Sequence, residues 1–561
     1  MGPYLAEKCV PMRVYFILMT LVASVVFGTG CRKAEPAAKT PDQKENKIAA
    51  PASKATNDFI GRIHFIGSTQ VFADTNSARL KEIGNLPVTG ELREHILQKL
   101  ATAPFRLLEQ RAAQKTNDHA VLIRPLCEDL LRAESYVEMR GATNPTPEVM
   151  LAIHLDNNRA ELWRTNLSTT LSSWTGIPIK EIEANGVKGW ELRKHHAPNI
   201  IRFLRAGDWV LFGWGQDELL LQTSLIDRIK KQGRPVVEAK NYWLDAWVDW
   251  PSLALQHTNL ANFKLPKTQI TVTATKEFIR PKVIMEFDEP LNVQLPPWQV
   301  PTNIIHDPLI SFTAVRGIAP WLKQINFIQQ LNLDKVPDEY FIWAMKQVPL
   351  ETCLVAPVQN GTNFMAQFAP QAVSLANTNL QKRRIGQVEW KTNKNQISWT
   401  GLPMIVPYLE MISTPQGDYM KGGIFPSPPR GTPPPAELLN QLGANSNVIY
   451  YDWEITEERL PQTENIIGLV WLASGRFLSQ PDITTQKWLD AVAPKLGNCG
   501  TMGTLTGPNE VTILRNSPIG LTGFELTMLK HWLDSPKFPW GFSNVRERSG
   551  VPKRPLAPPA P

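Results

Sequence analysis

Apolar residues follow both helical and strand periods through the body of the chain, from residue 58 to about residue 535. Between residues 160 and 174 they recur at spacings of three and four, which predicts a helix with one apolar face. Apolar runs at residues 200–203 and 209–214 flank the turn residues 206–208, Ala-Gly-Asp, and this pattern predicts a β-hairpin. Hairpins imply antiparallel pairing, so helices interspersed with hairpins predict an α+β fold.

The same reasoning places further elements along the chain. In the first half, a helix at residues 217–231 is expected to begin at Asp217 as its cap and to stop at Gly233, and a second hairpin joins residues 269–275 and 282–287. In the second half the pattern predicts a strand at 309–315, a helix at 319–331, a hairpin joining 386–391 and 396–400, helices at 465–473 and 484–495, and a closing hairpin at 501–514.

Short motifs recur about 200 residues apart in the same order, which indicates an internal duplication. The matched positions are Tyr136 with Tyr340, Trp190 with Trp390, and Asp249 with Asp452. We therefore expect an α+β protein with two tandem duplicated halves, each a largely antiparallel sheet with packed helices, preceded by a small helical segment. The predicted boundaries are a signal peptide at 1–30, a disordered tether at 31–57, the helical segment at 58–117, the two halves at 118–300 and 301–535, and a Pro- and Arg-rich tail at 536–561.

Residues 12–31, MRVYFILMTLVASVVFGTGC, have the layout of an export signal. Arg13 precedes an apolar run at residues 14–27, and small residues lead from that run to Cys31. A charged start, an apolar run of about 7–15 residues and a small-residue cleavage site define a secretory signal, whereas a membrane-spanning helix needs about 20 apolar residues. We therefore expect an exported protein whose true start is Met12.

The end of this signal, FGTGC at residues 27–31, resembles the lipobox of bacterial lipoprotein precursors. The resemblance implies cleavage after Gly30 and attachment of lipid, including palmitate, to Cys31. It places the protein on the cell membrane or the outer membrane, facing the periplasm or the exterior. An ordinary cleaved signal, in which Cys31 carries no lipid, is the alternative. Residues 307–322, DPLISFTAVRGIAPWL, together with the duplicated layout, resemble uncharacterised exported proteins of the planctomycete and verrucomicrobial type, which implies no known activity.

Composition narrows the classes of partner. The 561 residues contain 59 Lys and Arg against 52 Asp and Glu, a formal net charge of +7. Because most of the basic residues are dispersed, we expect no nucleic-acid partner and only a weak attraction to anionic lipid headgroups, beyond the N-terminal lipid itself. The five cysteines lack short spacings, which argues against a disulfide framework and a zinc site. We expect no cofactor and no metal, and we expect Cys127 and Cys353 to be buried free thiols.

Candidate chemistry is sparse, because the GxSxG, HExxH and paired CxxC motifs and the phosphate-binding loop are absent from the sequence. Asp249 and Asp452 are the one candidate pair, since carboxylates at matching places in two halves could share an acid or metal site. The ordinary alternative is that they end strands or pair with basic side chains. No catalytic residue is assigned.

We expect a non-catalytic binding or structural module whose partner is an envelope protein, a lipid or a glycan. The alternative is an envelope-polymer hydrolase with carboxylate-based catalysis. The two hypotheses predict different sites. An enzyme should bring ionisable groups with perturbed pKa values together in a pocket, whereas a binding module should show an exposed apolar or aromatic patch.

Overall fold

The structure is a computed structural model, and it describes residues 59–108, 116–141, 147–193, 199–216, 219–236, 241–254, 264–346, 351–383, 386–402, 405–425, 432–473, 476–478, 483–539 and 545–547. The chain divides into two compact units, Met1–Asp288 and Glu289–Pro561. This division falls close to the boundary at residue 300 that the sequence predicts.

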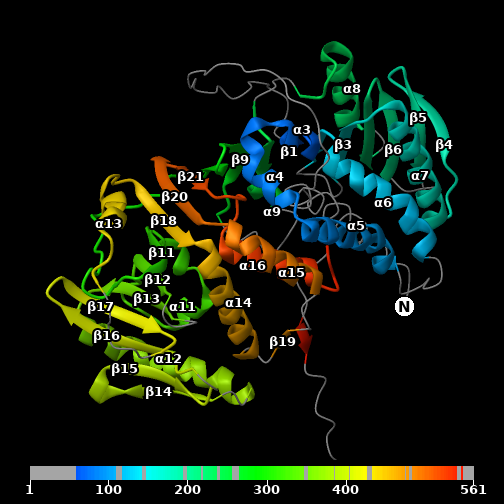
Figure 1. Ribbon diagram of the computed structural model, residues 1–561. Helices are drawn as coiled ribbons and strands as arrows, with labels where there is room; N and C mark the ends of the chain where they lie inside the picture. The colour runs from blue at the N-terminus through cyan, green and yellow to red at the C-terminus, as the bar shows by residue number, and fades with distance from the viewer. Residues whose placement is uncertain are drawn as a thin grey trace, which may run out of the picture. The chain divides into compact units, whose positions relative to one another are not determined.

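The first unit contains ten described strands, and the pairings among them are antiparallel (Figure 1). Their order is β4-β5-β6-β7-β3-β2-β1-β8-β9-β10. The strands are β1 (Phe59–Phe65), β2 (Ser135–Arg140), β3 (Glu148–His154), β4 (Lys180–Ala184), β5 (Val187–Arg193), β6 (Asn199–Ala206), β7 (Trp209–Gln216), β8 (Leu244–Asp249), β9 (Lys267–Ala274) and β10 (Ile279–Glu286).

Helices cover both faces of these strands, because successive side chains of a strand point to opposite faces. On one face Tyr136, Met150 and Leu211 form a core with Leu225 of α8. On the opposite face Trp190 donates its indole N–H to the backbone oxygen of Arg164 in α7, at 3.3 Å. The helices of this unit are α3 (Ser68–Ala73), η1 (Thr75–Ser77), α4 (Ala78–Gly84), α5 (Pro87–Leu108), α6 (Thr116–Arg132), α7 (Asn157–Thr175), α8 (Leu220–Gln232) and α9 (Trp250–Ala254).

The second unit repeats this order with its own strands, which are also paired antiparallel: β14-β15-β16-β17-β13-β12-β11-β18-β20-β21. The strands are β11 (Leu309–Arg316), β12 (Glu339–Met345), β13 (Thr352–Val358), β14 (Gln387–Lys391), β15 (Gln396–Thr400), β16 (Tyr408–Thr414), β17 (Gly417–Gly423), β18 (Val448–Ile455), β20 (Asn498–Gly507) and β21 (Glu510–Asn516). A separate short pair joins β19 (Arg476–Leu478) and β22 (Val545–Glu547).

Helices again lie on both faces of the second unit's strands. Leu438 and Leu442 of α13 join the core around Phe312, Phe341 and Trp343. The opposite face contacts α12 and α14. The helices are α10 (Ala319–Leu322), α11 (Asn326–Gln330), α12 (Gly361–Arg383), η2 (Thr392–Lys394), α13 (Ala436–Gly443), α14 (Thr456–Ala473), α15 (Ile483–Val492), η3 (Ala493–Lys495) and α16 (Gly523–Asp534).

The predicted fold class, α+β with antiparallel strands and packed helices, is confirmed. Gly233 ends α8 in the left-handed conformation, with a φ of 75°, as the sequence predicts. The proposed cap Asp217 lies outside the described residues, and α8 begins at Leu220. The helix predicted at 319–331 is instead two short helices, α10 and α11, neither of which contains a buried residue.

The segment predicted as helical, residues 58–117, begins with a strand. β1 pairs with β2 on one side and with β8 on the other, so it lies inside the strand order of the first unit. The helices α3 to α6 are therefore a long connection between β1 and β2, and do not precede the unit as a separate piece. Sequence alone cannot show this, because the partners of β1 lie about 70 and 180 residues further along the chain.

The identical strand order of the two units bears on the predicted duplication without confirming it. Tyr136 and Tyr340 lie in corresponding strands, β2 and β12, and Asp249 and Asp452 lie in β8 and β18. Trp190 lies in β5, however, whereas Trp390 lies in β14, which corresponds to β4. Two of the three matched pairs thus lie in corresponding strands and the third does not, so the duplication stays a prediction.

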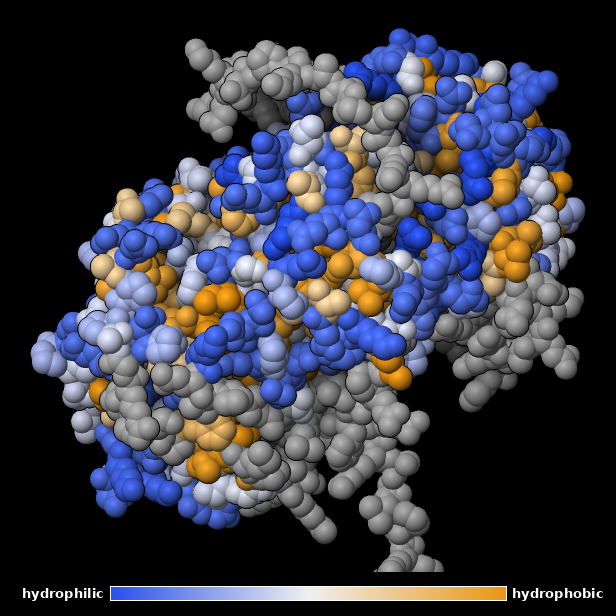
Figure 2. All heavy atoms as spheres, in the orientation of Figure 1, coloured by the Kyte–Doolittle hydropathy of each residue, from blue (hydrophilic) through white to orange (hydrophobic). Residues whose placement is uncertain are grey.

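None of the helices in the described part of the chain has the length and apolarity that a membrane crossing requires. Apolar residues also form separate patches among hydrophilic ones on the face shown in Figure 2. The large apolar side chains that are exposed come from several elements: Val121, Leu220, Ile325, Phe327, Val406, Ile483, Leu514 and Phe524.

Candidate functional site

The residues that the sequence singled out fall in three different places. Gly30 and Cys31 lie outside the described residues. Asp249 ends β8, and its carboxylate accepts a hydrogen bond from the backbone N–H of Ser252 at 2.9 Å, which caps α9. Asp452 lies in the middle of β18 and is buried. Each aspartate therefore has a structural role inside its own unit, and the shared site remains a prediction.

Asp452 belongs to a buried cluster of ionisable groups in the second unit. Its carboxylate accepts a hydrogen bond from the Thr313 hydroxyl at 2.7 Å. Two residues along the strand, Glu454 accepts from the backbone N–H of Gly523 at 2.6 Å and from the Thr456 hydroxyl at 2.9 Å. Burial raises the pKa of both carboxyl groups above their ordinary values.

Two arginines complete the cluster. Arg515 donates to the Thr501 hydroxyl at 2.9 Å and forms an ion pair with Glu525 at 2.5 Å. Arg459 donates to the side chains of Thr352 and Gln462, at 3.2 and 3.0 Å, and burial lowers its pKa. Arg515 thus joins β21 to β20 and α16, and Arg459 joins α14 to β13, so the cluster holds the two helices on the strands.

A surface cleft lies in the first unit, between α7 and the β4–β5 hairpin. It consists of two adjoining hollows of about 510 and 480 Å³ that share Glu161, Arg164 and Glu181. We call this the α7–β4 cleft. Its lining residues are mostly charged or hydroxylated: Ala160, Glu161, Arg164, Thr165, Ser168, Thr169, Ser172, Ile179, Glu181, Ile182, Glu183, Lys188, Gly189, Trp190, Phe203 and Arg205.

The lining follows from local structure. The residues from α7 recur at spacings of three and four, so they share one side of the helix. The hairpin turns at Asn185-Gly186, whose φ angles of 53° and 66° are those of a type I′ turn. Gly186 suits the left-handed position because it has no Cβ. The turn is held by Lys230, which donates to the backbone oxygen of Asn185 at 2.6 Å.

Arg164 lies at the centre of the α7–β4 cleft. Its guanidinium approaches Glu181 at 2.8 Å and Glu161 at 3.7 Å. The hydrogen bond with Glu181 raises the pKa of Arg164. Both carboxylates remain accessible, since the side chains of Glu161 and Glu181 are 64% and 66% exposed. Exposed ion pairs of this kind can exchange partners at little cost, because each is worth at most about 1 kcal/mol.

Two further charges line the cleft beside this network. Glu183 and Lys188 are opposite each other in the β4–β5 ladder and are exposed. Neither side chain forms a hydrogen bond or an ion pair with another described residue. Arg205 is engaged, since it donates to the backbone oxygen of Gly207 at 3.1 Å and also bonds Asn157. The cleft therefore offers one carboxylate and one ammonium group without a partner in the described part of the chain.

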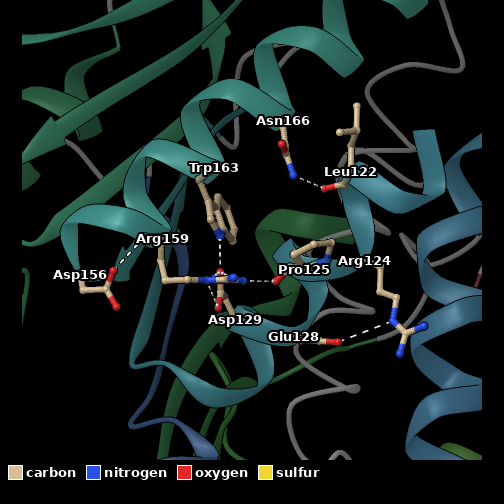
Figure 3. Close-up of polar contacts among 9 residues, drawn as sticks. All are labelled: Leu122, Arg124, Pro125, Glu128, Asp129, Asp156, Arg159, Trp163 and Asn166. Atoms are coloured by element: carbon tan, nitrogen blue, oxygen red, sulfur yellow. Dashed lines mark hydrogen bonds and ion pairs between the residues drawn. The ribbon is translucent and has the colours of Figure 1, made fainter. Parts of the chain in front are cut away.

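The wall formed by α7 is fixed from behind by a buried carboxylate (Figure 3). Asp129 of α6 accepts hydrogen bonds from the Arg159 guanidinium at 2.7 to 3.0 Å and from the Trp163 indole N–H at 2.8 Å. Asn166 adds a bond to the backbone oxygen of Leu122 at 2.7 Å. Bidentate Arg–carboxylate pairs are geometrically specific, so this contact sets the position of α7 relative to α6.

The two carboxyl groups whose pKa values are raised to about 7 lie away from the cleft. Burial raises the pKa of Glu148 and of Glu339 to about 7. Glu148 accepts the backbone N–H of Leu221 in α8, and Glu339 accepts that of Gln299. Neither residue, and neither Asp452 nor Glu454, lines the cleft. These four carboxyl groups accept hydrogen bonds from backbone or hydroxyl groups away from the cleft.

The prediction that Cys127 and Cys353 are buried free thiols is confirmed, and Cys499 is a third. Burial raises their thiol pKa values to about 12, 11 and 12, so they are poor nucleophiles. Within the described residues, no group of three or more His, Cys, Asp or Glu side chains could hold a metal ion.

Sequence reasoning missed the α7–β4 cleft. The helix was predicted, but the hairpin opposite it was not, although Asn-Gly between alternating residues is the strongest short-range hairpin signal. Comparison with protein-family models, with curated proteins and with solved structures finds no match for this chain. Function must therefore be argued from the geometry of the chain itself.

Proposed function

We propose that the protein is a membrane-anchored cell-envelope lipoprotein whose body is a non-catalytic binding module, with the α7–β4 cleft as its binding site. One observation carries the proposal. The cleft is open and presents unpaired charges and hydroxyl groups, while the carboxyl groups with raised pKa values lie elsewhere, engaged by hydrogen bonds. Catalytic acids and bases are expected to coincide with the pocket.

The α7–β4 cleft differs in character from the site that the sequence analysis predicts for a binding module. An apolar or aromatic patch was expected, whereas the α7–β4 cleft is mainly polar, and its aromatic residues Trp190 and Phe203 are almost fully buried. A polar lining favours a ligand recognised through charges and hydrogen bonds over a lipid chain. Among the three partner classes considered, this supports an envelope protein or a glycan.

The anchor is supported by the sequence at Gly30 and Cys31. Replacing the attachment residue, Cys31→Ser, should move the protein from the membrane fraction to the soluble fraction. The lipid provides stable attachment because more than one acyl chain inserts into the bilayer, at about 0.8 kcal/mol per buried methylene. Membrane fractionation of the wild type and the variant tests this. Unchanged membrane association of the variant would exclude Cys31 as the anchor.

The alternative, an envelope-polymer hydrolase, has one favouring observation. Asp452 and Glu454 are two neighbouring carboxyl groups whose pKa values burial raises, and a protonated acid is what general acid catalysis requires. Incubation of the protein with purified peptidoglycan sacculi separates the two functions. A binding module releases no soluble fragments, whereas a hydrolase releases fragments and loses that activity in Asp452→Asn and Glu454→Gln.

We further propose that the two units arose by duplication, because their ten strands share one order. The test is a superposition of an experimentally determined structure on itself. Backbone of β1 to β10 should match that of β11 to β18, β20 and β21 strand by strand. A match that requires reordered strands would contradict the duplication.

A further inference from the structure

Within the described residues, the outer edge of β4 has no strand partner. β4 pairs with β5 on one side. It cannot pair with β3, because β3 already pairs with β2 and with β7. An unpaired edge presents backbone N–H and C=O groups that readily accept a further strand. Three residues of this strand, Glu181, Ile182 and Glu183, line the α7–β4 cleft, which also extends over β5 and β6.

The turn geometry shows which backbone groups face outward. In a two-residue hairpin the residues that flank the turn, here Ala184 and Val187, form a hydrogen-bonded pair. Such pairs alternate with non-bonded ones along an antiparallel ladder. Ile182 therefore bonds to β5, whereas the N–H and C=O groups of Glu181 and Glu183 point away from it. Both outward-facing residues line the cleft, as does Ile182 between them.

The cleft has the length of a short extended segment. Its α7 wall extends from Ala160 to Ser172, which is about 18 Å at 1.5 Å per residue. An extended chain advances about 3.4 Å per residue, so about five residues fit between α7 and the edge of β4. β4 itself is five residues long, which matches this length. A groove between a helix and an open strand edge is an established way to bind an extended peptide.

Charge determines which peptide fits. A strand added to β4 would place every second side chain beside Glu181 and Glu183, with Glu161 across the cleft. Arg164 already neutralises part of the charge of Glu161 and Glu181. Lys188 lies opposite Glu183 on β5, on the side away from an added strand, so Glu183 is the unpaired charge nearest to an incoming cation. Opposite charges on neighbouring strands stabilise the pair, and like charges destabilise it.

We infer that the ligand is an extended peptide segment of a partner protein, with a Lys or Arg at every second residue, added to β4 as an extra strand. This inference rests on the proposed binding function and specifies its ligand. Backbone hydrogen bonds to Glu181 and Glu183 provide the pairing, the carboxylate of Glu183 selects the basic side chain, and the hydroxyl groups of α7 line the opposite wall.

The test uses fluorescein-labelled peptides and the full-length protein in detergent. The seven-residue peptide Thr-Lys-Thr-Lys-Thr-Lys-Thr should bind at least about tenfold more tightly, by fluorescence anisotropy, than the same peptide with Glu in place of Lys. The protein has a formal net charge of +7, so non-specific electrostatic attraction would favour the acidic peptide. Tighter binding of the basic peptide would therefore indicate a specific site.

Two substitutions of Glu183 separate the contribution of its backbone N–H to peptide binding from that of its charge. Glu183→Pro removes an outward N–H without breaking the bonds to β5, as proline allows on an edge strand, and should weaken binding about tenfold. Glu183→Gln keeps the N–H and should weaken binding about threefold. The matched control Glu437→Gln, at an exposed residue of α13, should leave binding unchanged.

The peptide supplies a second route if Glu183→Pro fails to fold. N-methylation at alternate residues blocks strand pairing when the methylated N–H groups face β4 and leaves it intact when they face away. One of the two methylated series should therefore lose binding about tenfold and the other should keep it. Equal loss in both, equal affinity for basic and acidic peptides, or no binding at all would overturn the inference. Those results leave the anchor and the sacculus assays unaffected, so the two failures are distinguishable.

Discussion

Two buried carboxylates of the first unit, Glu138 and Glu191, and two of the second, Asp452 and Glu454, are held in different ways. In the first, Glu138 is paired directly with Arg228 and accepts from the Tyr136 hydroxyl, and Glu191 is paired with Arg202. In the second, Asp452 and Glu454 accept hydrogen bonds from hydroxyl and backbone N–H groups. The same strand order therefore accommodates direct ion pairs at one place and, at another, carboxyl groups with raised pKa values that accept hydrogen bonds from hydroxyl and backbone groups.

The pKa shifts follow this difference. Burial acts to raise the pKa of Glu191, but hydrogen bonds from Arg202 and Arg193 outweigh it and lower the pKa. Burial prevails at Asp452 and Glu454, whose pKa values are raised. A buried charge is stable only beside its counter-ion, whereas a buried acid can stay protonated. Each prediction below changes one side of this comparison.

The largest effect is expected at the direct ion pair of the first unit. Glu138→Leu leaves the Arg228 guanidinium partly buried without its counter-ion, which should lower the free energy of unfolding by about 3–5 kcal/mol. Urea denaturation measures the change. The double variant Glu138→Leu/Arg228→Met removes both charges and should recover most of the loss. An equally unstable double variant would show that packing, and not charge, accounts for the effect.

Glu148 should make stability depend on pH between its ordinary pKa of 4.5 and its folded-state value of about 7. The folded state binds this proton more tightly than the unfolded state, so stability falls as the pH rises through that window. The full shift corresponds to about 3 kcal/mol. Glu148→Gln keeps an acceptor for the Leu221 N–H and should remove this part of the fall.

Unfolding curves at pH 4, 5.5 and 7.5 for the wild type and Glu148→Gln test that prediction. Because Glu339 also has a pKa of about 7, some decline should persist in the variant. The double variant Glu148→Gln/Glu339→Gln should then flatten the profile further. Profiles that coincide for the wild type and both variants would mean that neither carboxyl group holds a proton in the folded state.

Asp452→Asn should change stability by no more than about 1 kcal/mol at pH 7, and in the favourable direction. The amide oxygen can accept the Thr313 hydroxyl as the carboxyl oxygen does, while the buried charge is removed. Since the pKa of Asp452 is raised, the wild type loses stability as the pH rises above 3.8, and the variant should not. A loss above 2 kcal/mol, about twice the upper limit expected here, would show that Asp452 is ionised and directly compensated.

Local interactions were readable from the sequence, and distant ones were not. The Asp249 carboxylate caps α9 by accepting the backbone N–H of Ser252, three residues later, a spacing that is visible in the sequence. Asp452 was identified as a position of interest, but its partner Thr313 is separated from it by 139 residues. Nothing in the neighbouring residues reveals that contact, because it depends on the pairing of β11 with β18.

The other differences between the predicted and the observed fold depend on the order of the strands. Residues 59–65 alternate in the manner of a strand, whereas the pattern of the residues that follow predicts a helical segment. The Trp190 and Trp390 match was equally local, and the structure places the two residues in non-corresponding strands. The cleft depends on the same information, since it forms only where a helix between β3 and β4 returns over the β4–β5 hairpin.

The smallest effect on stability is expected at the surface of the cleft. Arg164→Gln removes an exposed network with Glu161 and Glu181, and exposed pairs contribute about 0–1 kcal/mol, so thermal unfolding should barely change. Binding should respond in the opposite sense to stability. Without Arg164 all three carboxylates of the cleft are free for an incoming cation, so affinity for the basic peptide should rise about threefold. A variant that unfolds much earlier would assign Arg164 to the core of the first unit, together with Glu138 and Arg228.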